Sequence, residues 1–260
     1  MLRDYANTAQ GQIHLRHQYN SDEGLPLICL HPAPYSGIYF ETLAPLLSAP
    51  SEIIAPDYPG YGGSDTPDDL PTIESYAKAM LQMMDDFGID QANLLGFHTG
   101  CLVALEMARQ QAERIHKLII IDAPYFTGDK RQEMYQAAAV ARELEDDVQS
   151  LSESFEFNIS RKLDHMSYER SFALFTEQLR PADRSHWAFH AAFTYDTEPA
   201  VQACSHAGLV IASKSMLHDA TLRFAAEAAN MSLIEKPDIT RSVMEEGAES
   251  IAEEVNRYLS

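Results

Sequence analysis

The sequence predicts an α/β fold built around a mostly parallel β-sheet, and three observations indicate that class. Short apolar runs alternate along the chain with amphipathic stretches of helical period. The runs are continuously apolar, as expected of strands buried between two layers of helices. The 260 residues are 45% hydrophobic and 22% charged, which suits one large core and excludes disordered, collagen-like and coiled-coil proteins.

The elements follow in order from these patterns. We expect strands at residues 25–30, 53–55, 93–95, 117–121, 208–212 and 231–235. Apolar residues three and four apart predict a helix from Thr72 to Phe87, with Thr72 as its N-cap and Gly88 ending it. Met80, Met83 and Met84 on this helix are expected to pack in the core. Two later helices are expected over residues 220–229 and 248–259.

The middle third differs in character. Helix formers dominate from Tyr125 to Pro199, and strand-like runs are nearly absent. We therefore predict a helical insertion between two halves of the sheet. The acidic run from Glu143 to Asp147 is expected to be a solvated helix face.

The charge balance restricts the partners. There are 19 basic and 39 acidic residues, a formal net charge of −20, and such a surface repels nucleic-acid phosphates and anionic lipids. Residues 1–12 lack the basic and then apolar run of a signal peptide, and no stretch is long and apolar enough to span a membrane. We expect a cytoplasmic protein that binds a small molecule, without nucleic acid or membrane partners, and the sequence leaves its oligomeric state open. The three cysteines do not suggest a disulfide framework, and Cys29 and Cys101 are expected in the core.

Two segments carry most of the information about a site. In Leu95-Gly-Phe-His-Thr-Gly100 an expected strand leads through a Gly-x-x-x-Gly turn into a helix. The central residue of such a turn is strained, and side chains at Gly96 and Gly100 would collide with the neighbouring strand and helix. The second segment, His31-Pro-Ala-Pro34, follows the first central strand, and its turn can aim backbone N–H groups at the same spot.

With these segments the chain resembles the α/β-hydrolase family. His31-Pro-Ala-Pro34 is similar to the oxyanion loop of that family, the segment from Asp57 to Asp65 is similar to its Asp-x-Pro-Gly-x-Gly-x-Ser motif, and Gly96 to Gly100 stands where the nucleophile elbow belongs. The resemblance implies an α/β-hydrolase fold with about eight strands and helices on both faces of the sheet. It also implies a core formed by residues 1–124 and 200–260, with residues 125–199 as a helical cap over the pocket.

The sequence departs from the family pattern at each position of the catalytic triad. The elbow residue is His98 rather than Ser, Asp or Cys. The loop from Ser213 to Leu217 contains no carboxylate, and the nearest acid beyond it is Asp219. No histidine occurs from Asp219 to Ser260. An ordinary Ser-His-Asp triad at these positions is therefore excluded.

The candidate site centres on His98, because an imidazole can act as a base, an acid or a nucleophile near neutral pH. Asp122 follows the strand after the elbow and is a candidate to orient the His98 ring through a hydrogen bond. The resemblance implies oxyanion donors at the backbone of Ala33 and Thr99. It places Tyr35, Phe97 and Tyr125 as pocket walls, with His31 holding the oxyanion loop and Asp57 stabilising its own turn.

Three functions remain open on these observations. The first is an enzyme that acts on a small apolar ester or carbonyl compound. The second is a catalytically inactive protein that binds a ligand or a protein partner through the same cavity. The third is a proton-transfer or lyase enzyme without a covalent intermediate.

No cofactor motif is present, so no cofactor is expected. His186 and His190 are spaced i, i+4 with Asp183 nearby, as in two-ligand metal sites. A third ligand is not evident, and the aromatic residues around them favour helix packing, so no metal is expected either.

Overall fold

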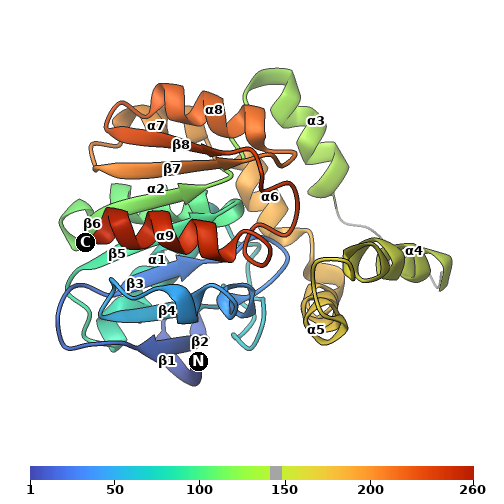
Figure 1. Cartoon of the computed structure of the whole chain (residues 1–260), viewed down its shortest axis with the longest axis horizontal. Coiled ribbons are helices and arrows are strands. Elements are labelled where there is room, and N and C mark those ends of the chain that lie inside the picture. The colour runs from blue at the N-terminus through green and yellow to red at the C-terminus, as the bar shows by residue number, and fades with distance from the viewer. Residues whose placement is uncertain (141–147) are drawn as a thin grey trace.

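The computed structural model describes residues 1–140 and 148–260. Its centre is an eight-stranded sheet in the order β1-β2-β4-β3-β5-β6-β7-β8 (Figure 1). The strands are β1 Leu2–Thr8, β2 Gly11–Tyr19, β3 Leu27–Leu30, β4 Glu52–Pro56, β5 Ala92–Phe97, β6 Ile115–Ile121, β7 Gly208–Ser213 and β8 Met231–Lys236. The predicted mostly parallel sheet is confirmed, because β3 to β8 pair in parallel.

The first two strands are additions to the elements expected from the sequence. β1 pairs with β2, and β2 with β4, in antiparallel register. β1 is the edge strand and exposes most of its residues to solvent, so it has no apolar run by which to recognise it. Each of the six expected strands is found, with ends that differ by one or two residues.

Helices cover both faces of the sheet. The α-helices are α1 Ile73–Asp86, α2 Thr99–Gln110, α3 Gly128–Ala138, α4 Val148–Asn158, α5 Tyr168–Leu179, α6 Trp187–Thr194, α7 Thr197–Ala203, α8 His218–Glu227 and α9 Ala248–Leu259. Short 3₁₀ helices are η1 Gly37–Phe40, η2 Ala44–Leu46, η3 Ala112–Arg114, η4 Ser160–Lys162 and η5 Ala182–Arg184. One core cluster joins the sheet to α1, α2 and Phe224 of α8, and a second joins its other face to α9, η1 and η2.

The expected helix at residues 72–87 is present as α1. The Thr72 side chain caps it by accepting a hydrogen bond from the Ser75 N–H. Met80, Met83 and Met84 are fully buried, as the sequence predicts. Among the described residues no helix is long and apolar enough to cross a membrane.

The described residues between β6 and β7 are helical and contain α3 to α7. Figure 1 shows α3, α4 and α5 to the right of the sheet, while α7 lies beside α8, which contacts β7. The helical character expected of this segment is thus present in its described residues, while its role as a separate cap stays a prediction. The acidic run from Glu143 to Asp147 lies outside the described residues.

Candidate functional site

The turn between β5 and α2 has the backbone shape that the sequence predicts. His98 adopts a φ of 50° and a ψ of −118°, in the positive-φ region that only a firmly held backbone keeps at a non-glycine residue. A Cβ at Gly96 would lie 2.5 Å from the Gly100 carbonyl oxygen, and a Cβ at Gly100 would overlap the Leu30 carbonyl of β3. The two glycines therefore allow α2 to pack directly against the sheet and fix the position of His98.

The His98 ring makes no side-chain hydrogen bond to the part of the chain that the structure describes. It is half-buried and contacts the Phe97 ring in a tilted arrangement, with ring centroids 4.1 Å apart. Its Nε2 is covered by protein and has no hydrogen-bond partner among the described residues. Burial lowers the pKa of His98 to about 4, against the opposing effect of the Asp122 charge. The ring is therefore neutral at neutral pH and carries an unused polar atom.

Asp122, the residue expected to orient His98, makes its side-chain hydrogen bonds elsewhere. Its Oδ1 accepts from the Ser213 N–H at 2.8 Å, and its Oδ2 accepts from the Ser213 hydroxyl at 2.5 Å. Both oxygens are thus used at the end of β7. No hydrogen bond joins Asp122 to His98 in the described part of the chain, so the influence of Asp122 on that ring is electrostatic.

Two backbone N–H groups are potential oxyanion donors, one in the predicted oxyanion loop and one at the start of α2. The N–H groups of Ala33 and Thr99 make no hydrogen bond within the described residues. Thr99 is the first residue of α2, where backbone N–H groups are free and the helix dipole favours negative charge. Ala33 follows β3 and thus lies next to β5 in the sheet. These groups can stabilise charge that develops on a bound oxygen.

His31 has the structural role that the sequence predicts. Its Nδ1 lies 2.9 Å from the Pro32 carbonyl oxygen, and its Nε2 accepts a hydrogen bond from the Tyr58 N–H at 3.1 Å. Burial lowers the pKa of His31 to about 4, so the neutral ring can both donate and accept. It connects the oxyanion loop to the turn after β4.

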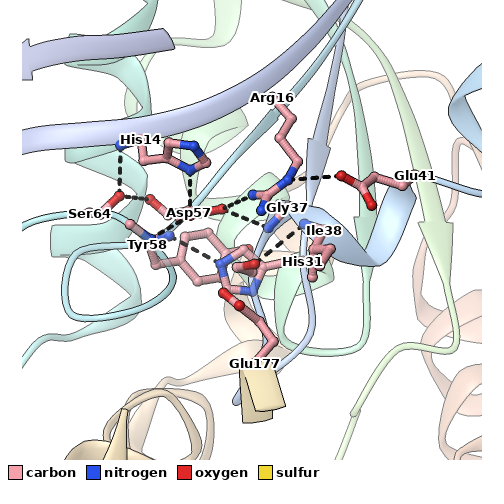
Figure 2. Close-up of polar contacts among 12 residues, drawn as sticks. His14, Arg16, His31, Gly37, Ile38, Glu41, Asp57, Tyr58, Ser64 and Glu177 are labelled. Carbon is pink, nitrogen blue, oxygen red and sulfur yellow. Dashed lines mark hydrogen bonds and ion pairs between the residues drawn. The ribbon is translucent and has the colours of Figure 1, made fainter. Parts of the chain in front are cut away.

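Asp57 stabilises that turn, again as predicted. Its two oxygens accept hydrogen bonds from the N–H groups of Gly37 and Gly63, each at 2.8 Å, and from His14 at 2.8 Å (Figure 2). Burial alone would raise the pKa of Asp57, but the bonds from His14 and Gly63 hold it below its usual value. The Asp57 carboxylate therefore has a structural role.

A chain of charged groups connects Asp57 with the inserted helices. Arg16 lies between Asp57 and Glu41 (Figure 2), and Glu41 in turn pairs with Arg170 of α5 at 3.3 Å. Arg170 also donates two hydrogen bonds to one oxygen of Glu245, at 2.7 and 2.9 Å, and one to the Ile38 carbonyl. The inserted helix α5 is thereby attached to the segments before β4 and after β8.

A second residue of α5 lies close to the same loop. Figure 2 shows Glu177 extending toward the group around His31. Its side chain is 10% exposed, and its Oε1 has no hydrogen-bond partner in the described residues, with Arg180 3.7 Å away. The neighbouring Gln178 accepts a hydrogen bond from the Tyr35 hydroxyl at 3.1 Å.

Aromatic rings form one wall beside His98. Phe97 stacks on Tyr39 at 5.5 Å, and Tyr39 contacts Tyr35 at 4.9 Å. Tyr39 was not among the residues expected at the site, because nothing in the local sequence distinguishes it from a core tyrosine. Tyr125, expected as a further wall, packs instead on Phe224 of α8 and takes no part in this stack.

The remaining candidates have other surroundings. Cys101 is buried, and its thiol contacts the carbonyl oxygens of Gly96 and Ile121, in agreement with a packed core residue. Its pKa is raised by burial. His190 contacts the Tyr135 hydroxyl through Nδ1 at 3.0 Å. No group of three metal-ligating side chains occurs within residues 1–140 and 148–260.

The sheet order and the strand, positive-φ turn and helix around His98 define an α/β protein with a sharp turn at the end of a central strand. The model of the alpha/beta hydrolase fold family matches residues 26–184, more than half of the chain. The chain therefore belongs to the α/β-hydrolase fold family.

Individual relatives are distant. A haloalkane dehalogenase of Mycolicibacterium paratuberculosis is 25% identical over 130 residues, which are 48% of this chain and 43% of that protein. A 2-hydroxy-6-oxo-6-phenylhexa-2,4-dienoate hydrolase of Burkholderia cepacia is 34% identical over 116 residues, 42% of this chain and 39% of that protein. The matches thus span less than half of these curated relatives.

Solved structures resemble the whole chain. A hydrolase from Pseudomonas aeruginosa PA01 has a TM-score of 0.82 at 18% identity and covers 99% of this chain and 98% of its own. The enol-lactonase from Burkholderia xenovorans LB400 has a TM-score of 0.80 at 18% identity, covering 98% and 99%. Because the sequence identity is 18%, this structural similarity shows that the chain shares the fold of these proteins.

Proposed function

We propose that the protein is a hydrolase that acts on a small, mostly apolar ester or related carbonyl compound, with His98 as the reacting group. The observation that carries the proposal is the neutral His98 ring on a strained turn, with its Nε2 unpaired. An unpaired buried polar atom costs about 1–3 kcal/mol, and such atoms are often kept where a ligand completes the bond. The Phe97, Tyr39 and Tyr35 rings supply an apolar wall for the substrate.

The chemistry follows from the neutral ring. An imidazole nitrogen of His98 attacks the carbonyl carbon, and the N–H groups of Ala33 and Thr99 stabilise the oxyanion that forms. The ester C–O bond then breaks, and the proton of the other ring nitrogen passes to the leaving alkoxide. Water adds to the acyl-imidazole, the C–N bond breaks as one proton of that water passes to a ring nitrogen, and the carboxylic acid leaves the neutral His98 ring. Residues 125–199 act in this proposal as the cap that covers the substrate.

The low pKa of His98 favours this chemistry over proton transfer. A general base is most effective when its pKa is near the working pH, whereas burial places the pKa of His98 at about 4. Such a ring abstracts a proton from carbon poorly, but its lone pair remains free to attack an activated carbonyl. Attack on an ester is therefore favoured over lyase chemistry.

One observation favours a second candidate, a ligand-binding protein without catalysis. Both oxygens of Asp122 are engaged by Ser213, so no carboxylate orients His98 through a hydrogen bond. A binding protein would retain the aromatic wall and the two backbone donors and would not turn its ligand over.

Turnover of small esters, thioesters, lactones and epoxides, measured for the wild type and for His98→Ala, separates the candidates. We expect the substitution to abolish ester turnover while the circular dichroism spectrum and the unfolding midpoint stay close to those of the wild type. Cys204→Ala, at a partly exposed thiol away from the turn, is the control and retains activity. Binding without turnover would favour the second candidate, and turnover indifferent to His98 would contradict the proposal.

A further inference from the structure

An arrangement of nucleophile, base and acid lies away from the β5–α2 turn. The Ser242 hydroxyl is 3.1 Å from His165 Nε2, and His165 Nδ1 is 2.5 Å from the Asp164 carboxylate. Asp164 and His165 come from the turn between η4 and α5, while Ser242 lies between β8 and α9. From this geometry we infer that Ser242, His165 and Asp164 form a second, serine-based nucleophilic site, which takes activated carboxylic esters.

The donor and acceptor roles in these hydrogen bonds suit this chemistry. The bond from His165 lowers the pKa of the Asp164 carboxyl, and Arg241, 3.5 Å away, acts in the same direction. Because an ionised carboxylate can only accept, His165 Nδ1 carries the proton and Nε2 is left to accept from the Ser242 hydroxyl. This is the tautomer that a general base for a serine requires.

The backbone at Ser242 resembles that at His98. Ser242 has a φ of 45°, and the Glu245 N–H donates to its carbonyl at 2.8 Å. At His98 the φ is 50°, and the Cys101 N–H donates to its carbonyl at 2.9 Å. In both places a non-glycine residue with positive φ precedes a helical turn, a strained conformation typical of functional sites.

The serine also has potential oxyanion donors. The N–H groups of Val243 and Met244, which directly follow it, make no hydrogen bond within the described residues. In the nucleophile elbow the N–H after the nucleophile has this function. The same two groups would stabilise a tetrahedral intermediate formed on Ser242.

The solvent exposure of Asp164 determines which esters the Ser242 site suits. The His165 side chain is 8% exposed, whereas that of Asp164 is 64% exposed and in contact with solvent. A solvated acid stabilises the imidazolium less than a buried one, since charge interactions weaken in a high dielectric. The site therefore suits esters with good leaving groups, which need little assistance.

The reaction is acyl transfer to serine. The Ser242 oxygen attacks the carbonyl carbon while its proton passes to His165 Nε2. The ester C–O bond breaks as Nε2 returns the proton to the leaving oxygen, which gives an alcohol and an acylated Ser242. Water then attacks the acyl carbon, giving its proton to Nε2. The bond to the Ser242 oxygen breaks, and the serine takes the proton back.

A fluorophosphonate probe tests the site directly, because it phosphonylates activated serines with loss of fluoride. We expect one adduct per chain, located on Ser242 by peptide mass spectrometry. Ser242→Gly removes the hydroxyl while glycine accepts the φ of 45° without strain, and it should abolish this adduct. His165→Gln should slow labelling about 100-fold or more, as expected for loss of a general base.

Controls separate chemistry from folding. Ser152→Ala changes an exposed serine on α4 and should label at the wild-type rate. Asp164 is a positioning residue, and Asp164→Asn should slow labelling and shift the ¹⁵N resonances of the His165 ring as the tautomer changes. An absent adduct, an adduct only on other residues, or a labelling rate unchanged in His165→Gln would overturn the inference. Labelling of Ser242 does not depend on His98. The turnover assay with His98→Ala therefore tests the proposed function, and the labelling assay tests the site at Ser242.

Discussion

His31 and His98 are both kept neutral by burial, and each has a pKa lowered to about 4. The two rings use this neutrality differently. His31 needs both a donor and an acceptor to join the Pro32 carbonyl to the Tyr58 N–H, whereas His98 leaves its covered nitrogen unpaired. In both cases protonation would place a charge where little water can solvate it.

Acid should therefore destabilise the protein in a defined window. Histidines of the unfolded chain bind protons near pH 6.5, while His31 and His98 in the folded protein bind them only near pH 4. Between these values the unfolded state holds more protons, so stability is present above pH 6.5 and is lost as pH falls toward 4. Each ring contributes about 1.4 kcal/mol per pH unit inside the window.

Urea unfolding at pH 7, 6 and 5 measures this loss. In His98→Gln the unfolding free energy should depend less steeply on pH than in the wild type. The difference in slope should be about 1.4 kcal/mol per pH unit, which corresponds to one proton. The low pKa of Asp57 does not interfere, because its contribution is lost only below its unfolded value near 3.8. An identical slope in wild type and variant would contradict the depressed pKa of His98.

At the level of single residues, the sequence predicts what local pattern encodes. The roles of His31, Asp57 and Cys101 and the strained turn at His98 follow from motifs a few residues long. The Ser213 partner of Asp122 lies 91 residues away, and Ser242 lies 77 residues from His165. Such pairings depend on where the elements meet in space, and no local spacing indicates them.

Among the elements, α5 is the one whose attachment depends most on charge. Arg170 contacts Glu245, Glu41 and the Ile38 carbonyl, and its side chain is only 15% exposed. Glu245 is also largely covered, with 8% of its side chain exposed. Removing the guanidinium would leave this carboxylate mostly buried, with the Thr42 hydroxyl as its remaining hydrogen-bond partner among the described residues.

Arg170→Met should consequently lower the free energy of unfolding by about 3 kcal/mol, because it leaves the carboxylate of a buried ion pair without its partner. Lys130→Met is the matched control. It removes an ion pair with Glu133 whose side chains are 52% and 66% exposed, and such pairs contribute less than about 1 kcal/mol. Equal losses in the two variants, measured by urea unfolding, would show that Arg170 does not attach α5 through its charge.

The elements themselves were predictable to different degrees. The buried parallel strands and α1 follow from continuous apolar runs and from helical periodicity. β1 was not predictable in this way, because it gains its place by pairing with β2 at the edge and exposes most side chains. Edge strands obtain their order from backbone bonds, which leave little trace in the side-chain pattern.

Over the whole molecule, the formal charge of −20 is the dominant electrostatic feature. Like charges on a folded surface repel one another and are brought closer by folding, so they reduce stability. Salt screens this repulsion over a distance of about 10 Å at 0.1 M. The surplus of acidic groups, 39 against 19 basic ones, means that repulsion outweighs the surface ion pairs.

Raising NaCl from 20 to 500 mM should therefore stabilise the protein, by about 1 kcal/mol or about 3 °C in melting temperature. The double variant Asp68→Lys and Asp69→Lys, at two exposed positions that form no ion pair within residues 1–140 and 148–260, changes the net charge from −20 to −16. Its response to salt should be smaller. A melting temperature that falls with NaCl would mean that attractive pairs prevail.

The two glycines beside His98 have a consequence for how this protein can change over evolutionary time. Gly96 and Gly100 shape the turn through contacts with Cys101 and Leu30 that do not involve the side chain at position 98. The scaffold therefore accepts different residues at that position with little change in its backbone. Selection can therefore exchange the side chain at position 98 by changing one codon while the backbone of the turn persists.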